Sequence, residues 1–130
     1  MTIKPTHVTF NQAKLLKEKG FKVKVNSYFF MAAISHGLQI DSCIEQDINL
    51  DFPNLHFKWS RPEQWIVIEW LRVKHSIWVE IGRMLIDNKS TFWYYINTSI
   101  DSKDKESKNI FNTPQEACSK AIDYVLTNLI

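Results

Sequence analysis

Residues 60–96 read SRPEQWIVIEWLRVKHSIWVEIGRMLIDNKSTFWYYI, and this stretch decides the fold of the chain. Its first four residues, Ser60 to Glu63, have the pattern of a helix N-terminus. The Ser60 hydroxyl can accept an amide hydrogen bond, a Pro lies in the first turn, and Glu63 can reach back to the Ser60 amide. The apolar residues that follow occur on nearly all sides of a helix, which indicates burial on more than one face. We therefore expect a central helix from Ser60, with core residues Trp65, Ile68 and Leu71.

Directly after this helix the apolar period changes to two, which is typical of a half-buried strand. Residues 77–83 place one set of side chains toward the core and another away from it. Residues 87–90 supply a turn, and residues 91–96 should return as the second strand of a hairpin. On this second strand we expect the alternating set Phe92, Tyr94 and Ile96 to face the core. The alternative is that Trp93 and Tyr95 do so, but each carries a polar atom that tolerates water.

The C-terminal part of the chain is predicted to form a loop and a helix. Residues 101–109 hold six charged residues among nine and no apolar one, so we expect a mobile loop there. Residues 110–111 can add a short third strand. Thr113 to Glu116 repeats the capping pattern with Pro114 at the first helical position. The helix that follows carries one apolar stripe, consisting of Ala117, Cys118, Ala121, Ile122, Val125 and Leu129.

The N-terminal part begins with another capping box, at Thr9 and Gln12, and its helix should run from about Phe10 to Lys19 and stop at Gly20. Strands are expected over residues 21–25 and 28–34, with a turn at 35–37. Residues 38–59 are predicted to be irregular or an edge-strand connection. The apolar residues at 48, 50 and 52 alternate with polar ones, but Pro53 limits any strand there to an edge.

Together these patterns predict an α+β fold in a single domain over residues 1–130. We expect an antiparallel sheet of about four to six strands covered by three helices. Within that domain, residues 1–37 form a helix plus strands and residues 60–130 form a helix-strand-strand-helix unit, with residues 38–59 between them.

Composition narrows the class of protein. A hydrophobic content of 45% with 13% aromatic residues excludes intrinsic disorder. The chain has no apolar run near the length of a membrane span, and its start lacks the apolar segment of a secretory signal. We therefore expect no membrane partner. The two cysteines, Cys43 and Cys118, do not make a disulfide framework, so a cytoplasmic location is the simplest expectation.

Neither a catalytic constellation nor a metal-binding pattern is recognisable in the sequence. The four histidines are scattered singly, and neither cysteine has a partner that would make it a nucleophile. Glu69 and Glu80 could suggest a pair of carboxylates, but surface pairing, of Glu69 with Arg72 in particular, explains them. We expect a protein that is not an enzyme and that needs no cofactor and no metal.

Two surfaces are candidate binding sites. The strand face that displays Trp78, Trp93 and Tyr95 could form an exposed aromatic platform, which suits a protein partner or self-association. The alternative is nucleic-acid binding by a basic N-terminal patch, because residues 1–25 carry six Lys and one Glu. The four residues of this patch are Lys14, Lys17, Lys22 and Lys24.

The segments SRPEQ (60–64), WLRVKHSIWVE (70–80) and TPQEA (113–117), with the opening segment FNQAKLLKEKGF (10–21), resemble small uncharacterised proteins encoded by bacteriophages and prophage-like elements. The similarity covers the two ends of the chain and weakens between residues 38 and 58. It implies an origin in a mobile element and assigns no activity. The sequence therefore predicts a non-catalytic accessory protein of such an element, which acts through protein binding.

Overall fold

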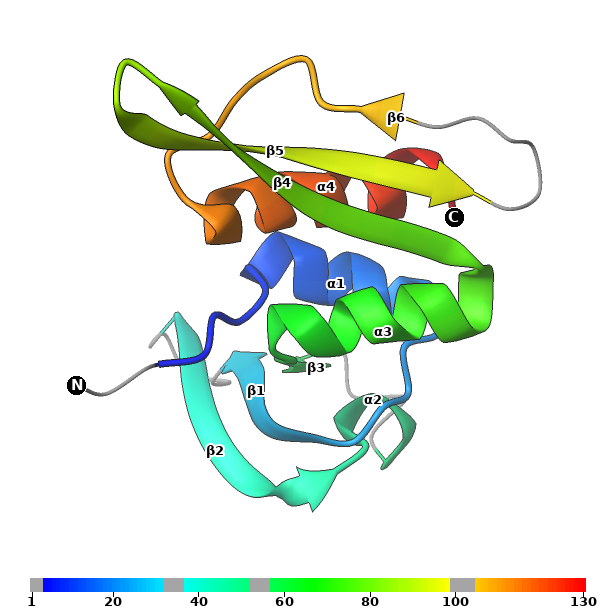
Figure 1. The fold of residues 1–130 in the computed structure, drawn as a ribbon. Helices are drawn as coiled ribbons and strands as arrows, with labels where there is room; N and C mark the ends of the chain where they lie inside the picture. Colours follow the sequence, from blue (N-terminus) through cyan, green and yellow to red (C-terminus); the bar gives the residue numbers. More distant parts are fainter. Residues whose placement is uncertain (1–3, 32–36, 52–56, 99–104) are drawn as a thin grey trace. The chain divides into compact units, whose positions relative to one another are not determined.

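The computed structural model describes residues 4–31, 37–51, 57–98 and 105–130, and its fold is α+β, as predicted (Figure 1). Within these ranges the six strands form two antiparallel sheets of three strands each, where the sequence suggested one sheet. Three helices have nine or more residues. The elements are α1 (Phe10–Glu18), β1 (Val25–Met31), β2 (Leu38–Gln46), α2 (Ile48–Asp51), β3 (Lys58–Ser60), α3 (Gln64–His75), β4 (Ile77–Ile86), β5 (Lys89–Thr98), β6 (Lys105–Glu106) and α4 (Pro114–Asn128).

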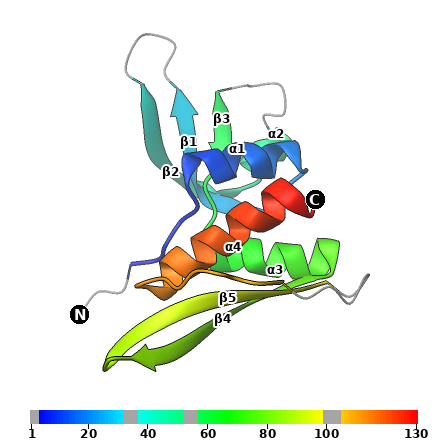
Figure 2. The ribbon, with the colours of Figure 1, turned by 90° about the horizontal axis from the view of Figure 1, so that it is seen from above.

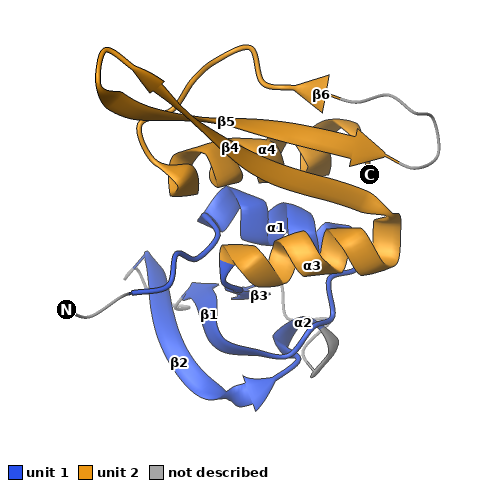
Figure 3. Cartoon of the chain, viewed as in Figure 1, with its two compact units in different colours: residues 1–63 blue, residues 64–130 orange. Residues whose placement is uncertain are grey.

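The chain divides into two compact units, Met1–Glu63 and Gln64–Ile130 (Figure 3). Each unit contains one of the two sheets, in the strand orders β2-β1-β3 and β4-β5-β6. This division does not test whether the whole chain is a single domain, which stays a prediction. The units are described separately below.

In the N-terminal unit, α1 begins at the predicted capping box. The Thr9 hydroxyl accepts a hydrogen bond from the Gln12 amide at 3.2 Å, and the Gln12 side chain accepts one from the Thr9 amide at 3.0 Å. The Phe10 ring of α1 lies edge-on against Phe29 of β1 and Trp59 of β3, with ring centroids 5.6 and 5.0 Å apart. The buried apolar residues of this unit are Val8, Ala13, Leu16, Phe21, Val25, Phe29 and Ile48.

Several predictions for the N-terminal unit are wrong in detail. The strand expected over residues 21–25 begins only at Val25, and residues 32–36 lie outside the described residues, as does most of the predicted turn. Residues 38–46 form an edge strand, β2, but residues 48–51 are helical. The physical reason lies in Asn49, whose buried side chain donates to the Phe21 carbonyl at 2.9 Å and accepts from the Ser60 amide at 3.2 Å. The alternation of apolar residues did not reveal these tertiary bonds.

In the C-terminal unit, β4 and β5 form a regular hairpin of two ten-residue strands, whose turn consists of Asp87 and Asn88. Both turn residues have positive φ, 50° and 63°, as a tight turn between twisted strands requires. Figure 2 shows α3 and α4 on the same side of this hairpin. Their buried residues pack with one face of the sheet, which we call the inner face, and its buried members are Ile77, Tyr94 and Ile96.

The orientation predicted for the second strand is confirmed, because Tyr94 and Ile96 are buried and Phe92 is half-buried. The stripe predicted for the last helix is also buried, except for Leu129, which is 38% exposed. The N-terminus of that helix is capped by the Thr113 hydroxyl, which accepts from the Glu116 amide at 3.1 Å.

The start predicted for the central helix is wrong. Ser60 is the last residue of β3, and α3 begins at Gln64. Residues 61 and 62 instead form hydrogen bonds within the N-terminal unit: the Arg61 amide donates to the Ser27 carbonyl, and the Pro62 carbonyl accepts from the Val8 amide, both at 3.0 Å.

Burial along α3 also differs from the prediction. The buried stripe of the helix runs through Gln64, Val67, Trp70 and Leu71, so Leu71 is in the core as expected. Trp65 lies off this stripe and is 62% exposed, while Ile68 is half-buried.

The charged segment 101–109 is partly ordered, contrary to the prediction. Its residues Lys105 and Glu106 form β6, which pairs with Ile96 and Tyr95 of β5. Phe111 makes an isolated bridge with Phe92, close to the third strand proposed at 110–111. Residues 101–104 lie outside the described residues.

Candidate functional site

The face of the β4–β5 hairpin opposite the inner face, which we call the outer face, carries the aromatic residues singled out from the sequence. Because side chains alternate along a strand, Trp78, Glu80 and Gly82 of β4 share this face with their partners on β5. Those partners are Asn97, Tyr95 and Trp93, respectively. Trp78 is 50% exposed, and Trp93 and Tyr95 are half-buried. The three side chains therefore lie on one face, as the sequence predicted.

Trp93 is held in place by the glycine opposite it. A Cβ atom added to Gly82 would lie 2.3 Å from Cζ2 of Trp93 and 2.5 Å from Cε2, so the indole ring covers the position that a side chain would occupy. A glycine inside a strand often marks such a close approach. Gly82 was therefore the signal in the sequence that could have revealed this cross-strand contact.

Trp78 is flanked by a charged pair from α3. The Arg72 guanidinium lies 5.4 Å from the centre of the Trp78 ring, within the range of a cation–π interaction. Glu69 orients this guanidinium through two hydrogen bonds, of 2.7 Å to Nη2 and 3.3 Å to Nε. Hydrogen bonding to Arg72 lowers the pKa of Glu69, and the same bonds raise the pKa of Arg72. The pairing of Glu69 with Arg72 expected from the sequence is confirmed.

The three predicted residues do not form one continuous stack. Trp93 and Tyr95 are separated along β5 by Tyr94, which faces the core, while Trp78 lies opposite Asn97 and diagonally across from Tyr95. The outer face also continues further than predicted, because β4 extends to Ile86. Met84 and Ile86 are 40% and 41% exposed on this face, and the predicted aromatic platform did not extend to them.

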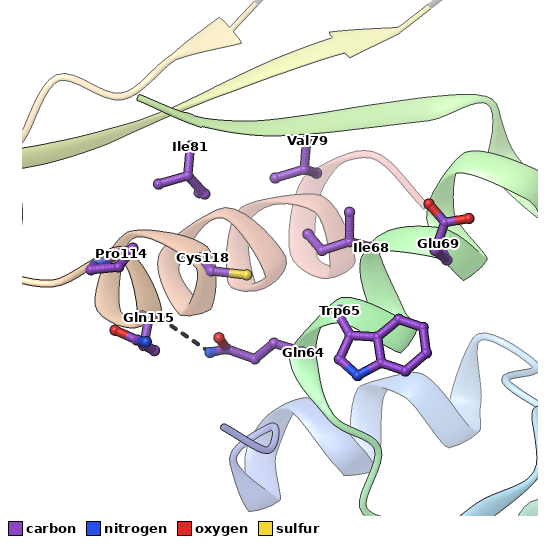
Figure 4. Close-up of a pocket in the computed structure, with 9 residues that line it drawn as sticks. All are labelled: Gln64, Trp65, Ile68, Glu69, Val79, Ile81, Pro114, Gln115 and Cys118. Atoms are coloured by element: carbon purple, nitrogen blue, oxygen red, sulfur yellow. Dashed lines mark hydrogen bonds between the residues drawn. The ribbon is translucent and has the colours of Figure 1, made fainter. Parts of the chain in front are cut away.

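A second surface of the same unit was not foreseen. Between α3, α4 and the inner face of β4 lies an open groove of about 430 Å³ (Figure 4). Its walls are mainly apolar, and the Gln64 side chain bridges the two helices by donating to the Gln115 carbonyl at 3.1 Å. Its lining residues are Gln64, Trp65, Ile68, Glu69, Val79, Ile81, Pro114, Gln115 and Cys118.

The structure brings together only part of the predicted basic patch. Lys14 and Lys17 line a cavity of about 360 Å³ with Glu18 and Trp59. The Lys14 ammonium lies 4.8 Å from the centre of the Phe10 ring, and that of Lys17 donates to the Lys58 carbonyl at 2.7 Å.

Burial lowers the pKa of Lys17. Lys22 and Lys24 are exposed in the segment before β1, and neither lines this cavity.

In the described part of the chain, no group of three or more His, Cys, Asp or Glu residues is placed so that it could hold a metal ion. Burial lowers the pKa values of His7 and His75, while His36 and His56 lie outside the described residues. Burial raises the pKa of the Cys118 thiol to about 11, so this thiol is not an activated nucleophile. Cys43 is a free, half-buried cysteine.

A polar cavity of about 320 Å³ lies in the N-terminal unit, beside the start of β1 and the middle of β2. Arg61 enters it from the end of β3 and donates from Nη1 to the Ser27 hydroxyl at 3.1 Å. Its Nε atom is buried and has no partner among the described residues. His7, Cys43 and Glu63 also line the cavity. Polar groups of opposite charge thus share this site.

Among the helices of the described ranges, none combines the length and the apolar character that crossing a membrane requires. Comparison with known proteins provides no family for this chain: no family model, curated protein or solved structure matches it.

Proposed function

We propose that the protein is a non-catalytic accessory protein that binds another protein through the outer face of the β4–β5 hairpin. The observation that supports this proposal is the half-exposed Trp78, which is flanked by Arg72 on a face that also displays Trp93, Tyr95 and Met84. Trp, Tyr and Arg are the residues most enriched among those that dominate binding energy in protein interfaces.

The arrangement of these side chains favours binding because they are already ordered in the free protein. Less conformational entropy is then lost when a partner binds. Trp93 lies across Gly82, and Arg72 is held by two hydrogen bonds to Glu69. Rigid aromatic side chains lose little conformational entropy on association, and preorganised groups raise affinity for that reason. The mobile-element origin belongs to the same proposal and rests on the sequence resemblance.

Affinity capture from host lysate, with and without nuclease, tests this function. We expect protein partners that survive nuclease treatment and that Trp78→Ala binds at least about tenfold more weakly, as is typical of an interface residue of this kind. Trp65→Ala is the matched control, because Trp65 is equally an exposed indole but lies on α3, away from the outer face. Equal recovery of partners by both variants would contradict the use of this face.

Nucleic-acid binding is the second candidate. Its support is the position of Lys14, which lines one cavity with Trp59, because a cationic side chain near an aromatic ring suits the phosphate and base of a single strand. In the same capture experiment, a variant with Glu at positions 14, 17, 22 and 24 separates the two functions. If its protein partners remain and survive nuclease, the nucleic-acid function is excluded.

A further inference from the structure

One edge of the sheet in the C-terminal unit has no partner among the described residues. The strand order β4-β5-β6 makes β4 an edge strand over its ten residues, and Figure 2 shows it at the outside of the hairpin. Proteins usually protect such edges with Pro, a bulge or a covering segment, because unpaired backbone groups are templates for another strand. β4 contains no Pro, and its pairing with β5 is free of bulges.

The hydrogen bonds on the far side of β5 show which backbone groups of β4 face this free edge. Phe92 exchanges both backbone hydrogen bonds with Phe111, at 2.9 and 2.7 Å, and the Tyr94 carbonyl accepts from the Ser107 amide at 2.9 Å. The backbones of Phe92 and Tyr94 therefore turn away from β4. Directly opposite residues of an antiparallel pair alternate between bonding to each other and turning outward.

Arg83 and Ile81, which are opposite Phe92 and Tyr94, must then turn outward as well. By the same alternation, the residues of β4 whose amide and carbonyl groups face the free edge are Ile77, Val79, Ile81, Arg83 and Leu85.

We infer that this edge pairs with β4 of a second copy of the chain, antiparallel and about a two-fold axis at Ile81. In this register Ile81 is opposite Ile81 of the second copy, Val79 is opposite Arg83, and Ile77 is opposite Leu85. All outward-facing residues of both copies are then bonded, with about ten hydrogen bonds across the axis if each such pair exchanges two. The two sheets become one continuous sheet of six strands.

The side chains of β4 are self-complementary in this register. Glu80 is opposite Gly82 of the second copy and Arg83 is opposite Val79, so neither charged residue of β4 has a like charge directly opposite it. Arg83 of the second copy is placed beside Val79, which shares the groove with the carboxylate of Glu69. Exposed Leu85, at 63%, is brought against Ile77.

The two neighbouring registers, with the two-fold axis one residue earlier or later on β4, pair the two copies less favourably. An axis at Glu80 sets two carboxylates opposite each other, and an axis at Gly82 leaves Ile77 unpaired. A second copy is therefore the occupant that we assign to this edge, because one register pairs every outward-facing backbone group and sets no charge directly opposite a like charge.

The inference is independent of the proposed function, since it is argued from the outward-facing backbone groups of β4 and not from the side chains of the outer face. It predicts an alternating pattern of amide hydrogen exchange along β4. At millimolar protein, the amides of Val79, Ile81, Arg83 and Leu85 should exchange at least about tenfold more slowly than at micromolar protein, because mass action favours the dimer. The amides of the even-numbered residues bond to β5 and should be protected at both concentrations. Equal exchange of the odd-numbered amides at all concentrations would overturn the inference.

A pair of variants at Arg83 provides a second test, by sedimentation or light scattering. Arg83→Pro removes an outward amide and leaves the β5 pairing intact, as edge strands tolerate. It should weaken dimerisation by about tenfold or more, since one hydrogen bond per copy is lost. Arg83→Ala removes the same side chain, keeps the amide and should dimerise nearly as the wild type does. Tyr95→Ala changes the outer face on β5, away from the free edge, and should leave the dimer intact.

A dimer that persists unchanged in Arg83→Pro, or one that Tyr95→Ala abolishes, would place the association on another surface and overturn the inference. Protection of the odd-numbered amides only after a different protein is added would equally overturn the assignment of a second copy.

Discussion

Gly82 and Trp93 show how a single residue controls the outer face. Without a side chain at position 82, the indole of Trp93 can lie flat on the neighbouring strand, where it covers backbone that would otherwise face water. Glycine costs strand stability through its extra freedom in the unfolded chain, and the aromatic contact offsets part of that cost. The position of Trp93 is thus determined by the residue that it faces.

A double-mutant cycle tests this coupling. Gly82→Ala should destabilise the protein by about 1 kcal/mol, because the new methyl group meets the ring and overpacks the site. In a Trp93→Ala background the same substitution should be neutral or stabilising by about 0.5 kcal/mol, because only the entropy of the unfolded chain remains. Urea unfolding of the four proteins measures both values. Equal effects in the two backgrounds would show that the ring does not occupy this position.

Cys118 is a second residue whose side chain by itself affects a property of the protein, here the pH dependence of its stability. Its thiol is buried, and its pKa rises from an ordinary value of 9.0 to about 11. The folded protein therefore holds this proton more tightly than the unfolded chain does. The corresponding stability is fully present below pH 9 and is lost as the pH rises toward about 11.

We expect the free energy of unfolding to fall by about 2 kcal/mol between pH 9 and 11 for this reason. Cys118→Ala should lack this part of the decrease and retain the part due to other groups. Urea unfolding of both proteins across that pH range measures the difference. Parallel curves for the two proteins would contradict a raised thiol pKa.

At the scale of elements, two similar sequence patterns have different roles. Thr9 and Gln12 form a complete capping box at the start of α1. Ser60 and Glu63 have equivalent residue types at the same spacing, but Ser60 ends β3, and its buried hydroxyl has no partner among the described residues. The pattern starts a helix at Thr9. It does not do so at Ser60, which pairs with Tyr28 of the neighbouring strand β1.

Alanine substitutions should separate these two cases. Thr9→Ala should cost about 1 kcal/mol, because it removes a hydrogen bond to an orphan helix amide. Ser60→Ala should cost almost nothing or stabilise slightly, because it removes a buried hydroxyl that has lost water without gaining a partner. Thermal unfolding compares the two variants directly. A loss for Ser60→Ala as large as that for Thr9→Ala would mean that the hydroxyl is bonded after all.

At the scale of the whole molecule, the charge is unevenly divided. Residues 1–63 carry eight Lys or Arg against six Asp or Glu, and residues 64–130 carry eight of each. The positive excess therefore belongs entirely to the N-terminal unit, which contains the candidate basic patch. An outer face on a unit of zero net charge suits a protein partner whose contacts are mainly aromatic.

Salt dependence tests the nucleic-acid alternative. Because the Lys17 ammonium bonds to the Lys58 carbonyl, we expect phosphate contacts from Lys14, Lys22 and Lys24. The logarithm of affinity should then fall with the logarithm of salt concentration at a slope of about −2 to −3, shallower than the −3 to −4 of four contacts. Fluorescence anisotropy with a labelled oligonucleotide measures the slope, and Lys17→Gln should leave it unchanged. Absence of binding at about 50 mM salt would exclude this function.

The sequence by itself determined the α+β class, the hairpin with its core-facing side chains, and the N-termini of α1 and α4. These features depend on local periodicity and on side chains within four residues of the backbone groups that they bind. Tertiary structure alone decided that the strands form two sheets, that residues 48–51 are helical around Asn49, and that α3 begins at Gln64. It also placed Trp65 at the surface, and Trp93 across Gly82. Each of these depends on a partner that is distant in sequence, because a hydrogen bond or a packed ring from another element outweighs a local preference of about 1 kcal/mol or less.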